Sequence, residues 1–375
     1  MRTQAGVQDA ATRRRGASMR LILAAGTTET ALVDGISAAG ETPELMAHTP
    51  PGDAEILVYG EPVRSPVTPV SPTGCVTPAA VTRAVREVCG FPVTVVDAGL
   101  AAPTAAPTVD VDAAPGADVR AERAVPNASG IFERARSLGT SLPDDEILLG
   151  ETVPGGTTTA LGVLTALGEE IGVSSSLPTN PLDRKRAVVD EGLAASGLDP
   201  GDAAGDPLTA IEAVGDPVQA TVAGLATGAL AGGTAVTLAG GTQQLAIAAA
   251  LRHAGVGGPV SVATTSFVAA DRGDDLDAAA DRLDLDLRVS DPGFDEGDHV
   301  AMERYCAGEV KEGVAMGGAL SLVPDRELPA VRDRFVAACG RLGVGDVVDT
   351  DPQSATDGTD GEETRDVTAP PSEGR

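Results

Sequence analysis

The sequence is poor in lysine and in aromatic residues. Its 375 residues include two lysines, Lys185 and Lys311, no tryptophan and two tyrosines, while 55 acidic residues stand against 27 basic ones for a net charge of −28. A chain this acidic repels phosphate backbones and offers few rings for base stacking, which argues against a nucleic-acid partner. An acidic, lysine-poor surface around a normal core is typical of a halophilic protein, kept soluble in a high-salt cytoplasm.

Cysteine and histidine are too few and too scattered for a metal site. The chain has four cysteines, none in a Cys-x-x-Cys pair, and three histidines. Structural zinc requires closely spaced groups of these residues, so we expect no metal. We expect the thiols of Cys75, Cys89, Cys306 and Cys339 to be buried and reduced.

Residues 217–251 carry no charge, which raises the question of a membrane span. The segment consists largely of Ala, Gly and Thr and contains two glycine pairs. This composition predicts a buried helix–strand–helix unit and no membrane helix. Near the N-terminus, Gly26 and Glu29 interrupt the apolar run 21–32, so it makes a poor signal peptide and we expect a cytoplasmic protein.

Two terminal segments differ in composition from the rest of the chain. Residues 1–18 are polar with three consecutive arginines, and residues 343–375 are rich in Asp, Thr, Gly, Pro and Glu with almost no apolar side chains. Both compositions predict disordered tails, the second one acidic. We therefore expect one ordered domain over residues 19–342.

Between these tails, short apolar runs alternate with amphipathic stretches. The repeated strand–glycine–helix pattern indicates an α/β fold with a mainly parallel, Rossmann-like sheet and helices on both faces. Ligands of such sheets bind beyond the carboxyl ends of the strands. The pattern predicts strands at Arg20–Ala25, Glu55–Tyr59, Pro92–Val96, Glu146–Leu149, Ala235–Leu238, Val260–Ala263 and Asp284–Val289. It predicts helices at Pro78–Cys89, Ile131–Leu138, Thr157–Leu167, Leu182–Ala194, Val218–Leu230, Thr242–His253, Val314–Leu322 and Glu327–Cys339, with surface excursions at 100–127 and 195–216.

Residues 150–159, Gly-Glu-Thr-Val-Pro-Gly-Gly-Thr-Thr-Thr, form a glycine-rich loop between an expected strand and an expected helix. The adjacent Gly155 and Gly156 allow a sharp turn and the close approach of a ligand. Thr157 can cap the helix, whose free N–H groups favour an anion. The loop is neither a Walker A motif nor the dinucleotide fingerprint. We interpret it as a phosphate-binding loop, with an ordinary strand–helix turn as the alternative.

Glu151 lies within this loop and needs a separate explanation. A carboxylate beside a bound phosphate is repelled, so Glu151 must point elsewhere, and a sugar hydroxyl or a ring nitrogen is a sensible partner. The alternative is a solvent-facing glutamate, which the N-terminus of a helix tolerates.

The segment 311–319, Lys-Glu-Gly-Val-Ala-Met-Gly-Gly-Ala, contains the second unusual carboxylate. Its small side chains leave a slot for a flat apolar ring, which Met316 can line and whose N–H Glu312 can reach. A glutamate in an apolar slot has a raised pKa and suits general-base catalysis near neutrality. The alternative is a glycine-rich turn before a helix, with a solvated glutamate.

Lys185, in the run Pro-Leu-Asp-Arg-Lys-Arg, is the other lysine of an arginine-rich chain. It can place a compact cation against a phosphate. Chance placement is the alternative.

Taken together, these segments resemble the nicotinate-mononucleotide-dependent phosphoribosyltransferases that make the lower-ligand nucleotide of cobamides, and more closely their archaeal branch. The resemblance covers the chain from about Arg20 to about Gly340 and rests mainly on the long loop at 150–159. The other matching segments are Thr27–Thr30, Gly35–Gly40, Thr49–Glu55, Thr77–Arg83, Ser174–Ser176 and Glu312–Ala319.

The resemblance implies roles for individual residues. Glu312 takes the position of the catalytic base and Glu151 that of a second active-site glutamate. Matches to the family's phosphate-binding and glycine motif positions imply substrate-binding roles for Gly155, Gly156, Thr157, Thr158, Lys185, Gly240 and Gly241. The chain departs from the bacterial pattern in having Ala239 where an Asp precedes this glycine, and in having Lys311 before Glu312.

The reaction that the resemblance implies is transfer of 5-phosphoribosyl from nicotinate mononucleotide to a heteroaromatic base such as 5,6-dimethylbenzimidazole or a purine, without a cofactor. It also implies a homodimer and a small helical subdomain, which the sequence does not delimit. A magnesium-dependent enzyme that uses a phosphoribosyl pyrophosphate is disfavoured, because Asp274 and Asp275 are not followed by the loop that such enzymes need. A non-catalytic phosphosugar or base sensor on the same fold is the alternative from another functional class.

Overall fold

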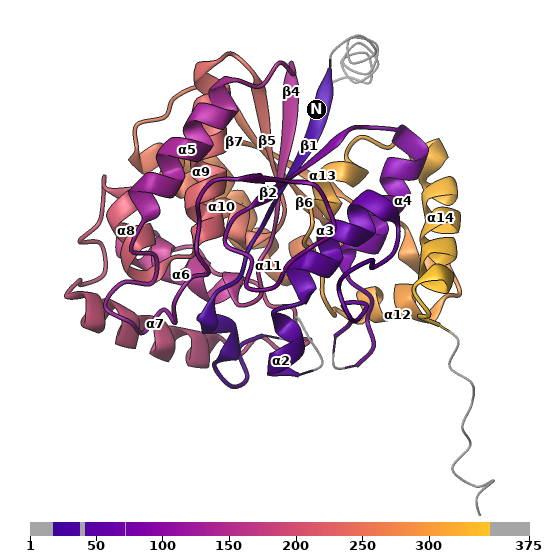
Figure 1. Cartoon of the computed structure of the whole chain (residues 1–375), viewed down its shortest axis with the longest axis horizontal. Coiled ribbons are helices and arrows are strands. Elements are labelled where there is room, and N and C mark those ends of the chain that lie inside the picture. The colour runs from indigo at the N-terminus through magenta and orange to yellow at the C-terminus, as the bar shows by residue number, and fades with distance from the viewer. Residues whose placement is uncertain (1–17, 38–41, 72, 346–375) are drawn as a thin grey trace, which may run out of the picture. The chain divides into compact units, whose positions relative to one another are not determined.

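A single parallel sheet organises the part of the chain that the computed structural model describes, residues 18–37, 42–71 and 73–345. Its seven strands lie in the order β3-β2-β1-β4-β5-β6-β7, and every neighbouring pair is parallel (Figure 1). The strands are β1 (Met19–Ala25), β2 (Val93–Asp97), β3 (Thr108–Asp110), β4 (Glu146–Thr152), β5 (Ala235–Ala239), β6 (Val260–Thr265) and β7 (Leu285–Ser290). The prediction of an α/β fold with a parallel sheet is confirmed.

The alternation of side chains along β1 divides the interior into two apolar cores. Leu21, Leu23 and Ala25 pack into one core, while Ile22 and Ala24 pack into the other. Successive side chains of a strand point to opposite faces, so a strand that is apolar at every position must be covered on both sides.

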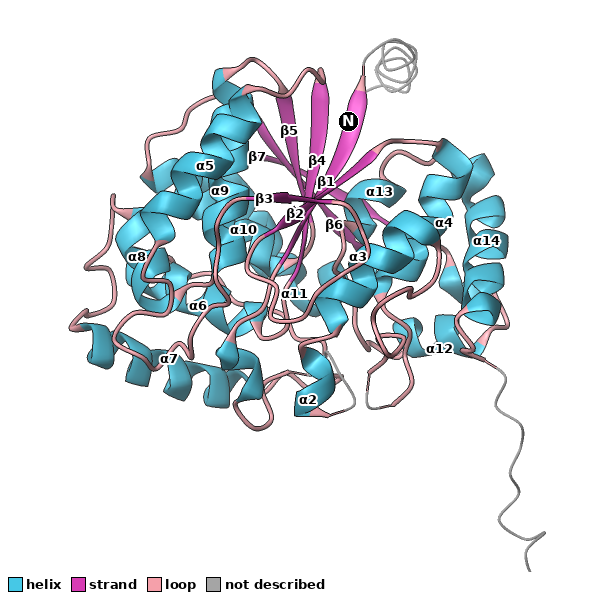
Figure 2. Cartoon of the chain, viewed as in Figure 1, coloured by secondary structure: helices cyan, strands magenta, loops and turns pink. Residues whose placement is uncertain are grey.

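Helices supply that cover on both faces of the sheet (Figure 2). One core is closed by α5 (Ala128–Thr140), α6 (Gly156–Leu167), α7 (Leu182–Ser196), α8 (Pro207–Val214), α9 (Pro217–Ala231), α10 (Thr242–His253) and α11 (Ser266–Leu283). The other is closed by α3 (Thr49–Tyr59), α4 (Pro78–Cys89), α12 (Val300–Cys306), α13 (Met316–Leu320) and α14 (Leu328–Arg341). Shorter elements are α2 (Pro43–Met46) and the 3-10 turns η1 (Glu29–Leu32), η2 (Phe294–Glu296) and η3 (Asp325–Glu327).

One predicted strand is wrong. Residues 55–59 form the last turns of α3, which begins at Thr49 with prolines in its first turn and ends at Gly60 with a φ of 95°. Nine residues of α3 are buried, so it lacks the polar face that would have given the sequence a helical period. The apolar run before a glycine therefore looked like a strand.

The segments expected to be surface excursions contain further structure. Residues 100–127 include the edge strand β3, and residues 195–216 include α8, whose Ile211 and Val214 are buried.

The cysteine prediction holds for Cys75 and Cys339, but Cys89 and Cys306 are exposed at the ends of their helices; all four thiols are free. Most of the two expected tails, residues 1–17 and 346–375, lies outside the described residues.

The uncharged segment 217–251 folds as helix, strand and helix, as predicted: α9, β5 and most of α10. Among the described residues, no helix has both the length and the apolar character needed to cross a bilayer.

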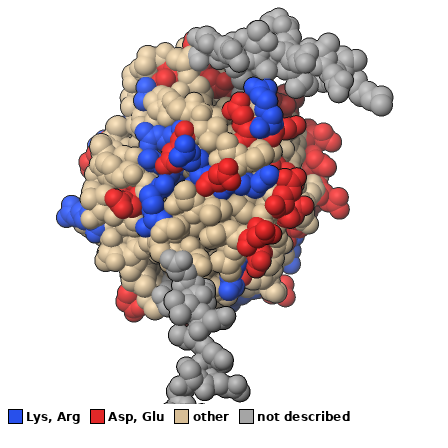
Figure 3. Space-filling view, turned by 90° about the vertical axis from the view of Figure 1, so that its right-hand side faces the viewer, with Lys and Arg blue, Asp and Glu red and all other residues tan. Residues whose placement is uncertain are grey.

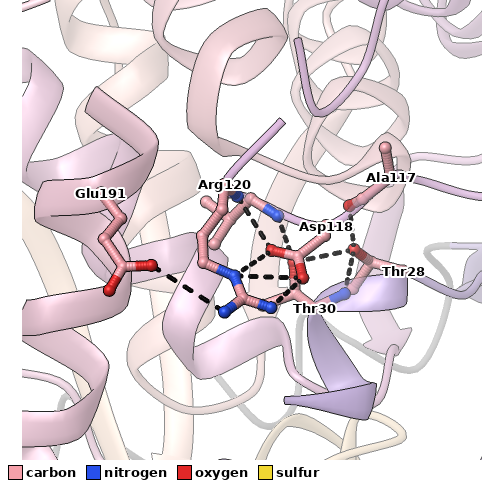
Figure 4. Close-up of polar contacts among 7 residues, drawn as sticks. Thr28, Thr30, Ala117, Asp118, Arg120 and Glu191 are labelled. Atoms are coloured by element: carbon pink, nitrogen blue, oxygen red, sulfur yellow. Dashed lines mark hydrogen bonds and ion pairs between the residues drawn. The ribbon is translucent and has the colours of Figure 1, made fainter. Parts of the chain in front are cut away.

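The strand order reverses between β1 and β4, because the chain runs from β1 outward to β3 and then returns to the other side of β1. The turn that follows β1 is joined to residues 117–120 by polar bonds (Figure 4). The Thr28 hydroxyl donates to the Ala117 carbonyl at 2.9 Å and lies 3.1 Å from Thr30 Oγ1, and Arg120 pairs with Asp118 at 2.6 Å. In open parallel sheets, ligands bind beyond the carboxyl ends of the strands at such a reversal.

Candidate active site

A pocket of about 940 Å³, counted with its open mouth, lies at the position that the topology indicates. Its wall includes residues that directly follow β4 and β5, residues of α3, the segment 174–176 and the segment 310–314. Its lining includes three acidic residues and one lysine: Asp53, Glu151, Glu312 and Lys311.

The glycine-rich loop after β4 forms one wall of this pocket. Gly155 has a φ of 80° and is the N-cap of α6, and a Cβ atom there would lie 2.8 Å from the backbone nitrogen of Ala31. A Cβ atom on Gly156 would overlap the side chain of Gln243. Gly155, Gly156 and Thr157 line the pocket, and their role in binding a substrate stays a prediction. In the first turn of α6, the N–H groups of Gly156 and Thr158 donate to the Val153 and Gly155 carbonyls, and within the described residues the N–H of Thr157 has no such partner and can meet an anion.

Two expectations about the threonines of this loop are wrong. Thr157 does not cap α6, because Gly155 is the N-cap and no side chain bonds the first turn. Thr158 is fully buried and does not line the pocket; its N–H donates to the Gly155 carbonyl at 2.9 Å. The cause is that the N-cap is Gly155, two residues before the predicted cap at Thr157, so that Thr158 lies on a buried side of α6.

A second helix begins beside the first. Gly241 is the N-cap of α10, again without a side-chain cap, and Gly241, Thr242 and Gln243 line the pocket. Gly240 is not in the wall: a Cβ atom there would lie 2.8 Å from Gln244 Cγ, so this glycine leaves room for the Gln244 side chain. Ala239 is fully buried against Gly318 of α13 and does not reach the pocket.

Glu151 lies near the end of β4 with its side chain buried at the base of the pocket. Burial, followed by repulsion from Asp216, Glu312 and Asp53, raises its pKa to about 8. At neutral pH the carboxyl is therefore mostly protonated and can donate a hydrogen bond to a ligand.

Glu312 also lines the pocket, with its carboxylate held by backbone groups. The N–H of Gly317 lies 3.1 Å from both carboxylate oxygens, and the N–H of Gly313 lies 3.1 Å from Oε1. Burial raises its pKa to about 7, against these hydrogen bonds, which lower it. The predicted raised pKa is confirmed, and it is suited to a general base near neutrality.

The backbone around Glu312 has an unusual conformation. Val310, Lys311, Val314 and Ala315 all have φ values between 52° and 62°, a region that β-branched residues rarely adopt. Strain of this kind persists only where surrounding contacts fix the chain, and it concentrates at functional sites. The contacts here include Thr265 Oγ1 donating to the Lys311 carbonyl at 2.7 Å and the Val314 N–H donating to the Glu151 carbonyl at 2.9 Å. The second bond joins the segments that carry the two glutamates.

Met316 does not line a slot for a ring, contrary to the sequence prediction. It is fully buried in the apolar core at the start of α13. The small residues after it serve helix packing, because a Cβ atom on Gly317 would lie 2.3 Å from the Thr264 carbonyl carbon, and one on Gly318 would lie 2.3 Å from Ala239 Cβ. The glycines thus allow α13 to pack directly onto the ends of β5 and β6.

Lys185 is likewise not where the sequence prediction placed it. Its side chain is fully buried on α7, outside the pocket wall, and its ammonium group donates to the Ser174 carbonyl at 2.8 Å. Burial and the nearby cations Arg272 and Lys311 lower its pKa to about 7. Lys185 contacts the segment 174–176 from the side that faces away from the pocket, so its side chain does not touch a ligand in the pocket directly.

Asp53 is a functional candidate that the sequence prediction missed. It lies on α3, lines the pocket, and accepts hydrogen bonds from Thr77 Oγ1 at 2.5 Å and Thr152 Oγ1 at 2.6 Å. Burial raises its pKa to about 7. An acidic residue within an otherwise buried segment was the available signal, but the segment had not been assigned to a helix. Asp274 and Asp275, by contrast, lie on α11 outside the pocket wall.

Comparison with known proteins gives close relatives in sequence and more distant ones in structure. A UPF0284 protein of Halobacterium salinarum is 55% identical over 323 residues, which is 85% of this chain and 97% of that protein. UPF0284 proteins of Methanothermobacter thermautotrophicus and Pyrococcus furiosus are 40% and 42% identical, over 86% and 80% of this chain and 92% and 90% of theirs. No protein-family model matches the chain.

Among solved structures, CobT from Thermus thermophilus has a similar fold, with a TM-score of 0.54 and 18% identity over 88% of this chain and 87% of its own. A second structure, of the nicotinate-nucleotide–dimethylbenzimidazole phosphoribosyltransferase from the same organism, gives a TM-score of 0.52 and 18% identity, over 88% and 86%. The chain therefore shares the α/β fold of these proteins.

Proposed function

The chain belongs to the UPF0284 family of archaeal proteins, and from the geometry of its pocket we propose that it is a phosphoribosyltransferase. It moves the 5-phosphoribosyl group of nicotinate mononucleotide to a benzimidazole-type or purine base, and the products are nicotinate and an α-riboside 5′-phosphate. The observation that carries the proposal is the presence of Glu312, with its raised pKa, in the same pocket as Glu151 and the glycine-rich start of α6.

The charges of the pocket complement this substrate. Nicotinate mononucleotide has a cationic pyridinium ring at one end and an anionic phosphate at the other. Three lining residues with raised pKa values, Asp53, Glu151 and Glu312, supply carboxyl groups, and the starts of α6 and α10 together with Lys311 supply positive potential. One structural neighbour, far from this chain in sequence, is a nicotinate-nucleotide–dimethylbenzimidazole phosphoribosyltransferase, which agrees with such a substrate.

The reaction needs one proton acceptor and no general acid. The bond between the anomeric carbon and the pyridinium nitrogen breaks, and its electron pair leaves with nicotinate, whose ring becomes neutral. A ring nitrogen of the acceptor base forms the new bond to this carbon, and the proton on its second ring nitrogen moves to Glu312. Glu151, protonated at neutral pH, donates a hydrogen bond to the sugar, and holding the two reactants together supplies much of the rate gain.

Mixing the purified protein with nicotinate mononucleotide and 5,6-dimethylbenzimidazole tests the proposal. We expect nicotinate to be released only when both are present, with one riboside phosphate formed for each nicotinate, as measured by chromatography. The protein could instead bind nicotinate mononucleotide and never cleave it, whichever of several benzimidazoles and purines is added. That result would indicate a non-catalytic phosphosugar or base sensor.

The proposal includes the setting of the enzyme. The resemblance noted above implies a cytoplasmic homodimer, and we assign the transferase domain to residues 19–342. Light scattering of the purified chain measures the oligomeric state, and a mass equal to one chain would remove the homodimer from the proposal.

A further inference from the structure

Both lysines of the chain are buried and end on one short segment of the pocket wall. Lys185 Nζ donates to the Ser174 carbonyl at 2.8 Å, and Lys311 Nζ donates to the carbonyls of Ser175 and Leu177 at 2.9 and 3.0 Å. The lysines come from α7 and from the strained segment before Glu312, which are far apart in the sequence. Two ammonium groups thus hold three backbone carbonyls of residues 174–177.

We propose that Lys185 and Lys311 are positioning residues that shape residues 174–176 into a binding site for the substrate's phosphate. This inference rests on the proposed function for the identity of the ligand. A trans peptide directs its carbonyl and its N–H to opposite sides. Because Lys185 holds the Ser174 carbonyl from behind the wall, the N–H of Ser175 is directed to the pocket side.

The serine segment adjoins the two helix starts already described. The Ser174 N–H donates to Thr242 Oγ1 at 3.0 Å in the first turn of α10, and Gln243 of the same turn lies against Gly156 at the start of α6. Backbone N–H groups from three segments therefore meet in one corner of the pocket. Such a cluster of donors binds a phosphate without a metal ion.

The two lysines also bring to this corner two amino groups whose charged form a bound anion would favour, because burial lowers the pKa of both, that of Lys185 to about 7. Within the described part of the chain, their ammonium groups donate to carbonyls and neither forms an ion pair, although Asp271 acts on both and raises their pKa values. Buried cations without an anionic partner are costly, and a bound phosphate would supply that partner. In a pocket with three carboxyl groups, an anion is expected to bind where these cations are.

The variants Lys185→Met and Lys311→Met test the inference, because methionine keeps most of the apolar stem and removes the ammonium group. Calorimetry compares their affinities for nicotinate mononucleotide, for nicotinate riboside, which lacks the phosphate, and for inorganic phosphate. Loss of a charge-assisted contact predicts that the affinity for both phosphate-bearing ligands falls by about tenfold to hundredfold. The affinity for the riboside should stay as in the wild type.

Arg252→Met is the matched control. Arg252 also donates to backbone carbonyls, those of Leu283, Val256 and Asp284 at 2.7–2.9 Å, but it lies outside the pocket wall. We expect this variant to bind all three ligands as the wild type does, even if its thermal stability falls. Lys185→Met is the cleaner of the two test variants, since Lys311 is adjacent to Glu312.

Three results would overturn the inference. The lysine variants could lose equal affinity for the mononucleotide and the riboside, or they could lose affinity for neither. The third is a wild type that binds neither the mononucleotide nor phosphate. The measurement does not depend on turnover. A wild type that binds nicotinate mononucleotide without releasing nicotinate contradicts the proposed function, while the lysine result still stands or falls on the ligand comparison.

Discussion

At the scale of single residues, the two glutamates of the pocket have the same side chain and different tasks. The Glu312 carboxylate accepts hydrogen bonds from the N–H groups of Gly313 and Gly317, and its pKa of about 7 allows it to take a proton near neutrality. Burial, followed by repulsion from three neighbouring carboxyl groups, raises the pKa of Glu151 to about 8 and keeps it protonated at neutral pH. Environments that separate the pKa values of paired carboxyls commonly assign one as base and the other as donor.

The raised pKa of Glu151 predicts a stability that depends on pH. The pKa of Glu151 is about 8 in the folded chain and 4.5 in its ordinary state, so the unfolded chain releases this proton at lower pH. Between these two pH values, each rise in pH therefore favours the unfolded chain and lowers the stability of the fold. We expect Glu151→Gln, which cannot ionise, to be more stable than the wild type by on the order of a few kcal/mol at pH 8, and by much less at pH 5. Urea unfolding at both pH values measures the difference.

The exposed Glu61→Gln, on the turn after α3, is the control for this prediction and should change little between the two pH values. A Glu151→Gln variant whose advantage is the same at pH 5 and pH 8, or that is less stable than the wild type at pH 8, would contradict the assigned protonation.

The sequence identified both glutamates and both loop glycines, because unusual residues in short motifs are visible without a fold. It misplaced Met316, Thr158 and Lys185, whose directions depend on where a helix starts and on what packs against it. Asp53 was missed because only the folded chain brings it to Thr77 and Thr152, which lie 24 and 99 residues away.

At the scale of elements, sequence patterns located the helices that have one polar face or a clear end. The bounds predicted for α4 and α10 are those observed. The patterns failed for α3, which is buried on most sides, and for α8, whose surroundings are rich in proline and glycine. The parallel sheet followed from alternation, but the pairing of β4 with β1 depends on contacts between segments more than 100 residues apart.

The start of α6 offers a test of the phosphate loop as an element. Gly155→Ala adds a Cβ atom at a φ of 80° and only 2.8 Å from the Ala31 backbone, so both strain and a clash must be relieved by moving the loop. Gly197→Ala, at the end of α7 with a φ of 69° and nothing within 4 Å of the added atom, carries the strain alone.

We expect Gly197→Ala to lower the free energy of unfolding by about 1–2 kcal/mol, the usual cost of a left-handed alanine, and to leave ligand binding unchanged. Gly155→Ala should cost more and should also weaken binding of nicotinate mononucleotide, as measured by denaturant unfolding and calorimetry. Equal costs for the two variants, with binding intact in both, would show that the close approach at Gly155 has no role in the site.

At the scale of the whole molecule, the chain has a net charge of −28, and acidic side chains and arginines are interspersed on the face that Figure 3 shows. Both lysines are buried, so the basic groups on the face shown are arginines. The two lysines thus occupy buried positions at which a compact ammonium group binds backbone carbonyls, and arginines form the exposed ion pairs.

This charge predicts that salt stabilises the fold. Raising KCl from about 0.1 M to about 1 M shortens the screening length from about 10 Å to about 3 Å and weakens repulsion among surface carboxylates. We expect the midpoint of thermal unfolding, followed by circular dichroism, to rise over this range. An uncharged osmolyte at equal osmolality is the control, and a midpoint that is unchanged or lower in KCl would contradict the role assigned to the surface.

The central claim is that Glu312 is the general base of a phosphoribosyl transfer, and the variant Glu312→Gln tests it most directly. The amide keeps the shape of the side chain and cannot accept the proton, so nicotinate release from nicotinate mononucleotide and 5,6-dimethylbenzimidazole should fall by about a hundredfold or more. Calorimetry should show nicotinate mononucleotide still bound, and Glu303→Gln on the exposed side of α12 should behave as the wild type. Nicotinate release by Glu312→Gln at a rate near that of the wild type would contradict the account.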